Sequence, residues 1–201
     1  MKNNHLLLAD ELKKEALDVI NHPVLETFTK YGKIHFSGSA ELDLLVYPDL
    51  DVYFDCYDAD CDVAEIFAQA VSNAVKSPDV RSVKLAKELY KNCSNVPKGI
   101  YLQIKLKTKT NIWQIDIWYL ESQKELFEKL KETEQLKSKI DSDTDKKNLI
   151  LEAKHALKRP DGSTPSFSSY HVYHAVLNEG LMDIESIKEY VASRNIQPIK
   201  Y

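Results

Sequence analysis

The sequence predicts an α+β protein in which a mixed β-sheet flanked by helices is followed by a C-terminal helical domain. Strand-like runs of apolar or alternating residues are confined to the first 120 residues. Amphipathic helical periodicity occurs on both sides of these runs, and no strand-like run follows Glu121. We therefore expect an N-terminal α/β domain over residues 1–120 and a helical domain over residues 121–201.

The N-terminal part is predicted to contain three helices. Apolar residues recur at helical spacing over residues 8–20, with charged residues between them, which is typical of an amphipathic helix. Pro23 suits the first turn of a second, short helix. Asp62, followed three residues later by Glu65, resembles a capping box and predicts a third helix that extends to residue 74.

Strand-like runs lie between and after these helices. Five runs have strand character: residues 34–36, 49–56, 80–89, 100–107 and 112–119. The polar segment 107–111 predicts a hairpin turn between the last two. Within residues 49–56, alternation places Asp49, Asp51, Tyr53 and Asp55 on one face and apolar residues on the other. This strand therefore has one polar and one buried face.

The C-terminal part is predicted to be entirely helical. Helical periodicity covers residues 124–140, 145–158, 169–178 and 183–191. The segment 159–166 contains two prolines and a glycine and is predicted to be a loop. A ligand site between the two parts is expected, because clefts between domains are common ligand sites.

Three acidic residues stand out chemically. Asp49 and Asp51 lie side by side at the start of a strand, where their charges repel and contribute nothing favourable to folding. Asp116 lies in a mostly apolar strand, between Ile115 and Ile117, where an unpaired carboxylate is costly. A divalent cation offsets both costs, and Mg²⁺ is usually held by one or two carboxylates together with substrate phosphates.

The order of these motifs resembles that of the nucleotidyltransferase superfamily. A Gly-Ser turn, Gly38-Ser39, is followed by a short helical connection, by Asp49-x-Asp51 at a strand start, and by the third carboxylate, Asp116, on a later strand. The chain departs from the family pattern at Pro48, where Ser or Thr often stands. It also lacks the glycine often found a few residues after the Gly-Ser pair. These departures leave the subfamily open.

The resemblance implies transfer of a nucleoside monophosphate from a nucleoside triphosphate to an acceptor hydroxyl. Asp49 and Asp51 are the expected metal ligands, and Asp116 is expected to complete the coordination or to take the acceptor's proton. Gly38 and Ser39 are expected to approach the triphosphate. Two Mg²⁺ ions are expected, with Mn²⁺ as a substitute, and ATP is the favoured donor.

Residues of the helical part are further candidates for nucleotide binding. The resemblance suggests a basic residue there for the triphosphate, and Lys154 is the candidate, with a solvated helix face as the alternative. Tyr170 and Tyr173 are helical neighbours at positions i and i+3, so they either stack on a base or pack in the core.

The preferred acceptor is a small molecule resembling an aminoglycoside or lincosamide. Acidic residues outside the metal set are expected to attract a cationic acceptor, and they are Glu41, Asp43, Asp55 and Asp58. One alternative is a protein or tRNA acceptor, as in toxin–antitoxin relatives. A tRNA acceptor calls for a basic strip, and the lysine-rich patches are residues 98–109 and residues 124–139, the second mixed with acidic residues. Another is a non-catalytic nucleotide-binding member of the superfamily.

Composition and missing motifs exclude other classes. A net charge of −4 argues against a general nucleic-acid binder. The three cysteines, Cys56, Cys61 and Cys93, are odd in number and indicate neither a disulfide framework nor a zinc site. His171 and His174 have no third metal ligand nearby in sequence. Apolar runs are too short for a membrane span, so we expect a soluble, cytoplasmic protein with no membrane partner; its oligomeric state stays open.

Overall fold

The computed structural model describes residues 2–58, 61–87, 98–158 and 168–194. Its centre is a five-stranded sheet in the order β1-β2-β5-β4-β3. The strands are β1 (Gly32–Ser37), β2 (Asp49–Cys56), β3 (Val80–Lys87), β4 (Gly99–Lys107) and β5 (Ile112–Leu120). The central pair β2 and β5 runs parallel, and every other pair is antiparallel. The predicted α+β architecture with a mixed sheet is confirmed.

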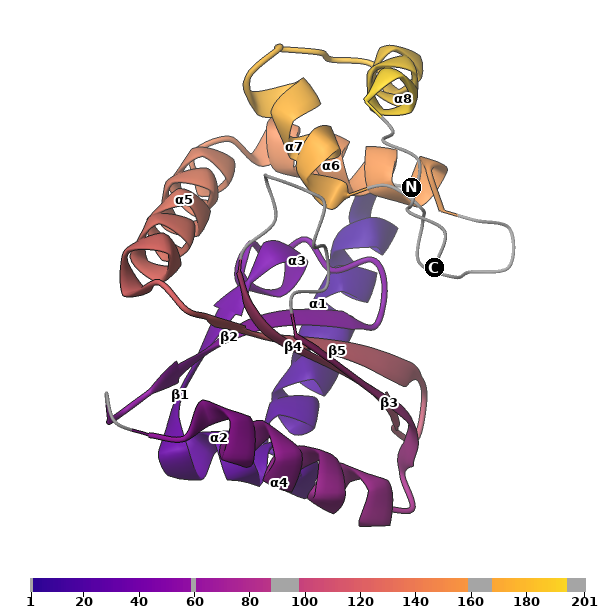
Figure 1. Ribbon diagram of the computed structural model, residues 1–201. Coiled ribbons are helices and arrows are strands. Elements are labelled where there is room, and N and C mark those ends of the chain that lie inside the picture. The colour runs from indigo at the N-terminus through magenta and orange to yellow at the C-terminus, as the bar shows by residue number, and fades with distance from the viewer. Residues whose placement is uncertain (1, 59–60, 88–97, 159–167, 195–201) are drawn as a thin grey trace.

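One face of the sheet is buried under the helices of the N-terminal part (Figure 1). These are α1 (Lys2–Ile20), α2 (Glu26–Tyr31) and α4 (Val63–Lys76), with a 3₁₀ turn at Pro23–Leu25. Phe28, Phe54 and Phe67 meet there edge to face, with ring centroids 5.1 to 6.1 Å apart. The apolar side chains of β2 and β5 complete this first core.

The remaining helices lie beyond the opposite face, around a second core (Figure 1). They are α3 (Gly38–Glu41), α5 (Gln123–Asp141), α6 (Thr144–Ala156), α7 (Ser169–Leu177) and α8 (Ile184–Ser193). The second core takes Ala9 of α1 and Leu42, Leu44 and Val46 of the α3–β2 connection as well as the C-terminal helices. The division at residue 120 stays a prediction.

Asp62 caps α4, as its capping-box pattern predicted, and accepts a hydrogen bond from the backbone N–H of Glu65 at 3.0 Å. Asp183 caps α8 in the same way. The first helix, however, begins at Lys2 rather than near residue 8. The His5 ring stacks on His155 of α6, with ring centroids 4.2 Å apart, so a tertiary contact extends this helix beyond its amphipathic pattern.

The expectation about cysteines is wrong at one place. Cys56, at the end of β2, is joined by a disulfide bond to Cys61, which precedes α4. The short connection between these two elements brings both sulfur atoms together, which the odd cysteine count does not reveal. Cys93 lies outside the described residues. No helix in the described ranges is long and apolar enough to cross a membrane.

Glu15 ties α1 to the hairpin between β4 and β5. Its carboxylate accepts hydrogen bonds from the side chains of Thr108, Thr110 and Asn111. Burial acts to raise the pKa of Glu15, but these hydrogen bonds outweigh it and lower the pKa. A lowered pKa in the folded state stabilises the protein above the ordinary value of 4.5, and this contribution fades as pH falls.

We expect Glu15→Gln to lower the free energy of unfolding by about 1 kcal/mol at neutral pH, because the side chain is only partly buried and solvent weakens charged hydrogen bonds. Urea denaturation at pH 7 and at pH 3.5 measures the effect, which should shrink at the lower pH. Glu11→Gln, an exposed position on the same helix, is the matched control. Equal losses in both variants would contradict this role of Glu15.

Candidate active site

The Gly38-Ser39 turn lies directly against Asp51. Gly38 begins α3 with φ +57°, a conformation that residues with a Cβ atom rarely adopt. A Cβ atom at this position would lie 2.6 Å from Oδ2 of Asp51. Glycine is therefore required here for two reasons, the backbone conformation and the close approach of the carboxylate.

The sheet register brings the three predicted carboxylates to one place. Asp49 opens β2, and Asp51 pairs across the parallel ladder with Asp116 of β5. On the other side of β2, Asp51 is paired with Ser37, which immediately precedes the Gly-Ser turn. Residues far apart in sequence thus meet because β2 lies between β1 and β5.

These carboxylates are held where their charges are unfavourable. Burial, followed by the charges of Asp51 and Asp116, raises the pKa of Asp49 well above its usual value. Burial and the charge of Asp116 raise the pKa of Asp51 to about 7. Burial also raises the pKa of Asp116, against hydrogen bonds from Tyr101, Gln103 and Gln114 at 2.8 to 3.2 Å.

A divalent cation fits the donor chemistry of Asp49 and Asp51. Oδ1 of Asp49 is buried and has no hydrogen-bond partner among the described residues, which is costly for a carboxylate. Within the same residues, no three ligand side chains are already gathered around a metal position. The site therefore suits an ion that is bound by two carboxylates and takes its other ligands from phosphates and water.

Lys154 of α6 is buried beneath the Gly-Ser turn. Its Nζ donates hydrogen bonds to Oγ of Ser39 at 2.7 Å and to the carbonyl of Leu44 at 2.6 Å. Burial lowers the pKa of Lys154 to about 7, although Asp49 and Asp51 act to raise it. The alternative of a solvated helix face is wrong, because the side chain is only 1% exposed.

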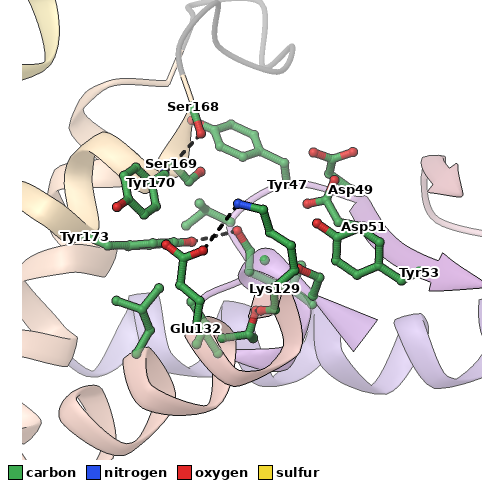
Figure 2. A pocket seen from close by; sticks show the side chains of 18 residues that line it. Tyr47, Asp49, Asp51, Tyr53, Lys129, Glu132, Ser168, Ser169, Tyr170 and Tyr173 are labelled. Atoms are coloured by element: carbon green, nitrogen blue, oxygen red, sulfur yellow. Dashed lines mark hydrogen bonds and ion pairs between the residues drawn. The ribbon is translucent and has the colours of Figure 1, made fainter. Parts of the chain in front are cut away.

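A pocket of about 630 Å³ lies between the sheet and the C-terminal helices (Figure 2). Its walls come from the start of β2, from the Gly-Ser turn, from α5 and from the start of α7. Its polar lining includes Ser39, Asp49, Asp51, Lys129, Glu132, Ser169 and Tyr170. The pocket therefore joins the carboxylate pair to residues of the helical part, whereas Asp116 and Lys154 are not in its lining.

The two candidate tyrosines have different environments. Tyr170 lines the pocket and is 44% exposed, so its ring is accessible to a ligand. Tyr173 is only 3% exposed, and its hydroxyl lies 2.9 Å from Oγ of Ser39. Tyr173 also lines the pocket, but its ring belongs to the second core and its hydroxyl supports the turn, which favours the core-packing alternative for this residue.

Lys129 is one of the pocket residues that sequence reasoning missed. Figure 2 shows its side chain rising from α5 with the amine inside the pocket, where it bonds to Glu132 at 3.4 Å. Residues 124–140 contain many lysines at similar spacing, so periodicity alone does not distinguish Lys129 from the others. Only the packing of α5 beside β1 and β5 identifies it.

Other candidates lie outside the pocket. Glu41 is paired with Lys137 at 2.7 Å, and Asp43 is paired with Lys13 at 2.5 Å, so these acids are already neutralised. Asp55 accepts a hydrogen bond from Gln123. Nδ1 of His174 lies 2.8 Å from the hydroxyl of Tyr190, so this nitrogen is used in a contact with a tyrosine.

No protein-family model and no curated protein matches the sequence. Solved structures do match. The complex of the poly(A) polymerase GLD-2 with GLD-3 has a TM-score of 0.61 and 16% identity, over 86% of this chain and 55% of that chain. The GLD-2/RNP-8 complex has a TM-score of 0.60 and 15% identity, over 88% and 64%. A cytoplasmic RNA terminal U-transferase has a TM-score of 0.52 and 22% identity, over 82% and 44%.

These likenesses establish the fold. The chain has the fold of the nucleotidyltransferase superfamily, as the order of its motifs predicted. The chain covers only 44% to 64% of the length of these structures. At these identities, a shared activity does not follow from the shared fold.

Proposed function

We propose that this protein transfers a nucleoside monophosphate from a nucleoside triphosphate to an acceptor hydroxyl, with Mg²⁺ bound by Asp49 and Asp51. The observation that supports this most is the buried carboxylate pair. These groups lie against a Gly-Ser turn and open into a pocket of about 630 Å³. A protein gains nothing from such a pair unless a cation binds there.

Bound Mg²⁺ would stabilise the negative charge on the triphosphate as the bond to pyrophosphate breaks. The acceptor oxygen attacks the α-phosphorus, and the bond from that phosphorus to the bridging oxygen of the pyrophosphate breaks. Asp116 would hold the acceptor hydroxyl and take its proton, because its raised pKa makes it a better base than an exposed aspartate. Tyr101 and Gln103 fix the orientation of this carboxylate.

The donor nucleotide would lie between the Gly-Ser turn and α7. The exposed ring of Tyr170 is suited to stacking on the base, and Lys129 provides a cation for the triphosphate. Ser39 and Ser169 offer hydroxyl groups from opposite walls. Lys154 would act through Ser39, which it holds in place. Stacking on Tyr170 does not distinguish one base from another. The choice of ATP as the donor is therefore part of this proposal.

The acceptor that we now favour is an RNA end, the alternative to the small molecule expected from sequence. Solved structures similar to this chain are named for poly(A) polymerase and RNA terminal U-transferase activities. In addition, Glu41 and Asp43, two of the acids expected to attract a cationic acceptor, are paired with lysines outside the pocket. Both observations favour a nucleic-acid hydroxyl over a cationic small molecule.

Thermal shift with ATP, GTP, CTP and UTP, each with and without Mg²⁺, tests the donor site. We expect a nucleotide to raise the unfolding temperature only when Mg²⁺ is present.

Tyr170→Ala should weaken nucleotide binding about tenfold or more, because stacking of one base contributes about 1–3 kcal/mol. The control is Tyr57→Ala, which removes a tyrosine that is 73% exposed outside the pocket. Equal affinities in both variants would contradict the role of Tyr170.

A further inference from the structure

The two strands β3 and β4 carry charge of a single sign. Residues 80–87 and 99–107 contain five basic residues and no acidic residue, although the protein has a net charge of −4. The basic residues are Arg81, Lys84, Lys87, Lys105 and Lys107. β3 is an edge strand of the sheet, so this charge is concentrated at one side of the molecule.

The register shows which of these lysines share the face of Asp116. Asp116 is paired with Gln103 of β4, and Gln103 is paired with Lys84 of β3. Asp116, Gln103 and Lys84 thus form one row across the strands, from β5 to the edge strand β3. Lys105 stands two residues after Gln103 and points to the same side, opposite Gln114 of β5.

Side-chain contacts agree with this register. Gln103 donates a hydrogen bond to Oδ1 of Asp116 at 3.1 Å, which places both side chains on one face. Burial is the largest influence on the pKa of Asp116 and raises it, while the charge of Lys84 acts to lower it. Lys84 therefore lies within electrostatic reach of the carboxylate, about two strand spacings or 10 Å away.

An aromatic row lies beside the carboxylate on the same face. It consists of Tyr53 of β2, Trp118 of β5 and Tyr101 of β4, which are paired across the sheet. The rings of Tyr101 and Trp118 have centroids 4.7 Å apart, and the hydroxyl of Tyr101 donates to Asp116 at 2.8 Å. Tyr101 is only 6% exposed, so the partly exposed rings of Trp118 and Tyr53 are the ones that can stack on the base of an acceptor nucleotide.

The lysines are accessible on this face. Lys84 and Lys105 are exposed, whereas the alternate residues Val83 and Ile104 pack into the first core. Within the described ranges, the helix that packs on both β3 and β4 is α4, and it does so from the core face. Exposed cations in a row leading to Asp116 would repel a cationic acceptor and attract a chain of phosphates.

We propose that the acceptor is the 3′ end of a single-stranded nucleic acid bound across this sheet face. Its terminal base lies on Trp118 of the aromatic row, its 3′-hydroxyl reaches Asp116, and its preceding phosphates lie over Lys84 and Lys105. This inference rests on the proposed function and gives the surface that binds its acceptor. The net charge of the whole chain argued against nucleic-acid binding, but the charge of β3 and β4 has the opposite sign.

Binding of a fluorescently labelled oligoadenylate RNA of about 15 nucleotides, followed by anisotropy without Mg²⁺ or nucleoside triphosphate, tests this site directly. We expect the double variant Lys84→Glu/Lys105→Glu to weaken binding at least about tenfold. The slope of log affinity against log salt should also fall by about 1.4, since each phosphate contact to a single strand contributes about 0.7. Trp118→Ala should weaken binding about tenfold and leave the salt slope unchanged.

The matched control is Lys14→Glu/Lys76→Glu, which makes the same charge change at exposed positions on α1 and α4, behind the sheet. An equal loss in this control would overturn the proposal, because binding would then follow net charge only. Failure of the unmodified protein to bind the oligonucleotide, with its Mg²⁺-dependent nucleotide shift intact, would also overturn it and leave nucleotidyl transfer standing. Oligonucleotide binding that depends on the two lysines, without any nucleotide shift, would support this surface and contradict the proposed transfer.

Discussion

Asp51→Asn is expected to reduce nucleotidyl transfer by about a thousandfold or more. The substitution keeps the volume of the side chain but removes the charge that would bind Mg²⁺ at the base of the pocket, and such electrostatic losses are large in a buried site. Transfer of a radiolabelled monophosphate to an oligonucleotide, assayed at saturating Mg²⁺ and nucleoside triphosphate, measures the effect. A variant that transfers at the unmodified rate would show that the metal site lies elsewhere.

Asp51→Asn should fold normally, and its stability should depend less on pH than that of the unmodified protein. The pKa of Asp51 is about 7 in the folded protein and 3.8 in an exposed aspartate. Between these values the folded state holds a proton that the unfolded state releases, so stability falls as pH rises from about 4 to about 7. Asp51→Asn should flatten this decline in the metal-free protein, as measured by urea denaturation. Asp55→Asn, on the same face of β2, is the control for both measurements and should leave transfer within a few-fold of the unmodified rate.

Gly38→Ala is expected to reduce transfer by about a hundredfold, although it adds only one methyl group. The new Cβ atom would lie 2.6 Å from Oδ2 of Asp51, so either the carboxylate or the turn must move. A displacement of about 1 Å in a catalytic group is sufficient for a loss of this size. Steady-state transfer kinetics together with urea denaturation separate the loss of activity from the loss of stability.

Gly180→Ala is the matched control for this prediction. Gly180 also has a positive φ, +69°, but a Cβ atom there meets nothing within 4 Å. It should therefore lose about 1–2 kcal/mol of stability from the backbone conformation alone and keep its activity. If Gly38→Ala and Gly180→Ala lose the same stability and neither loses activity, the contact between Gly38 and Asp51 has no catalytic importance.

The fold was largely predictable because its signals are local. Strand alternation, capping residues such as Asp62 and Asp183, and the order of Gly38-Ser39, Asp49-x-Asp51 and Asp116 all lie within short windows of sequence. The shared face of Asp49 and Asp51 follows directly from the two-residue period of a strand. Local periodicity does not reveal contacts between distant segments, so the early start of α1 and the bond between Cys56 and Cys61 were missed.

The chain by itself determined which chemical groups are present and on which face of each element they lie. Tertiary structure alone decided which of them meet. The order of the strands places Asp116 beside Asp51, and the packing of the C-terminal helices buries Lys154 while it leaves Lys129 in the pocket. Strand order likewise collects the lysines of β3 and β4 on one edge. The physical reason is that net charge and periodicity are sums over the sequence, whereas binding depends on which charges share a surface.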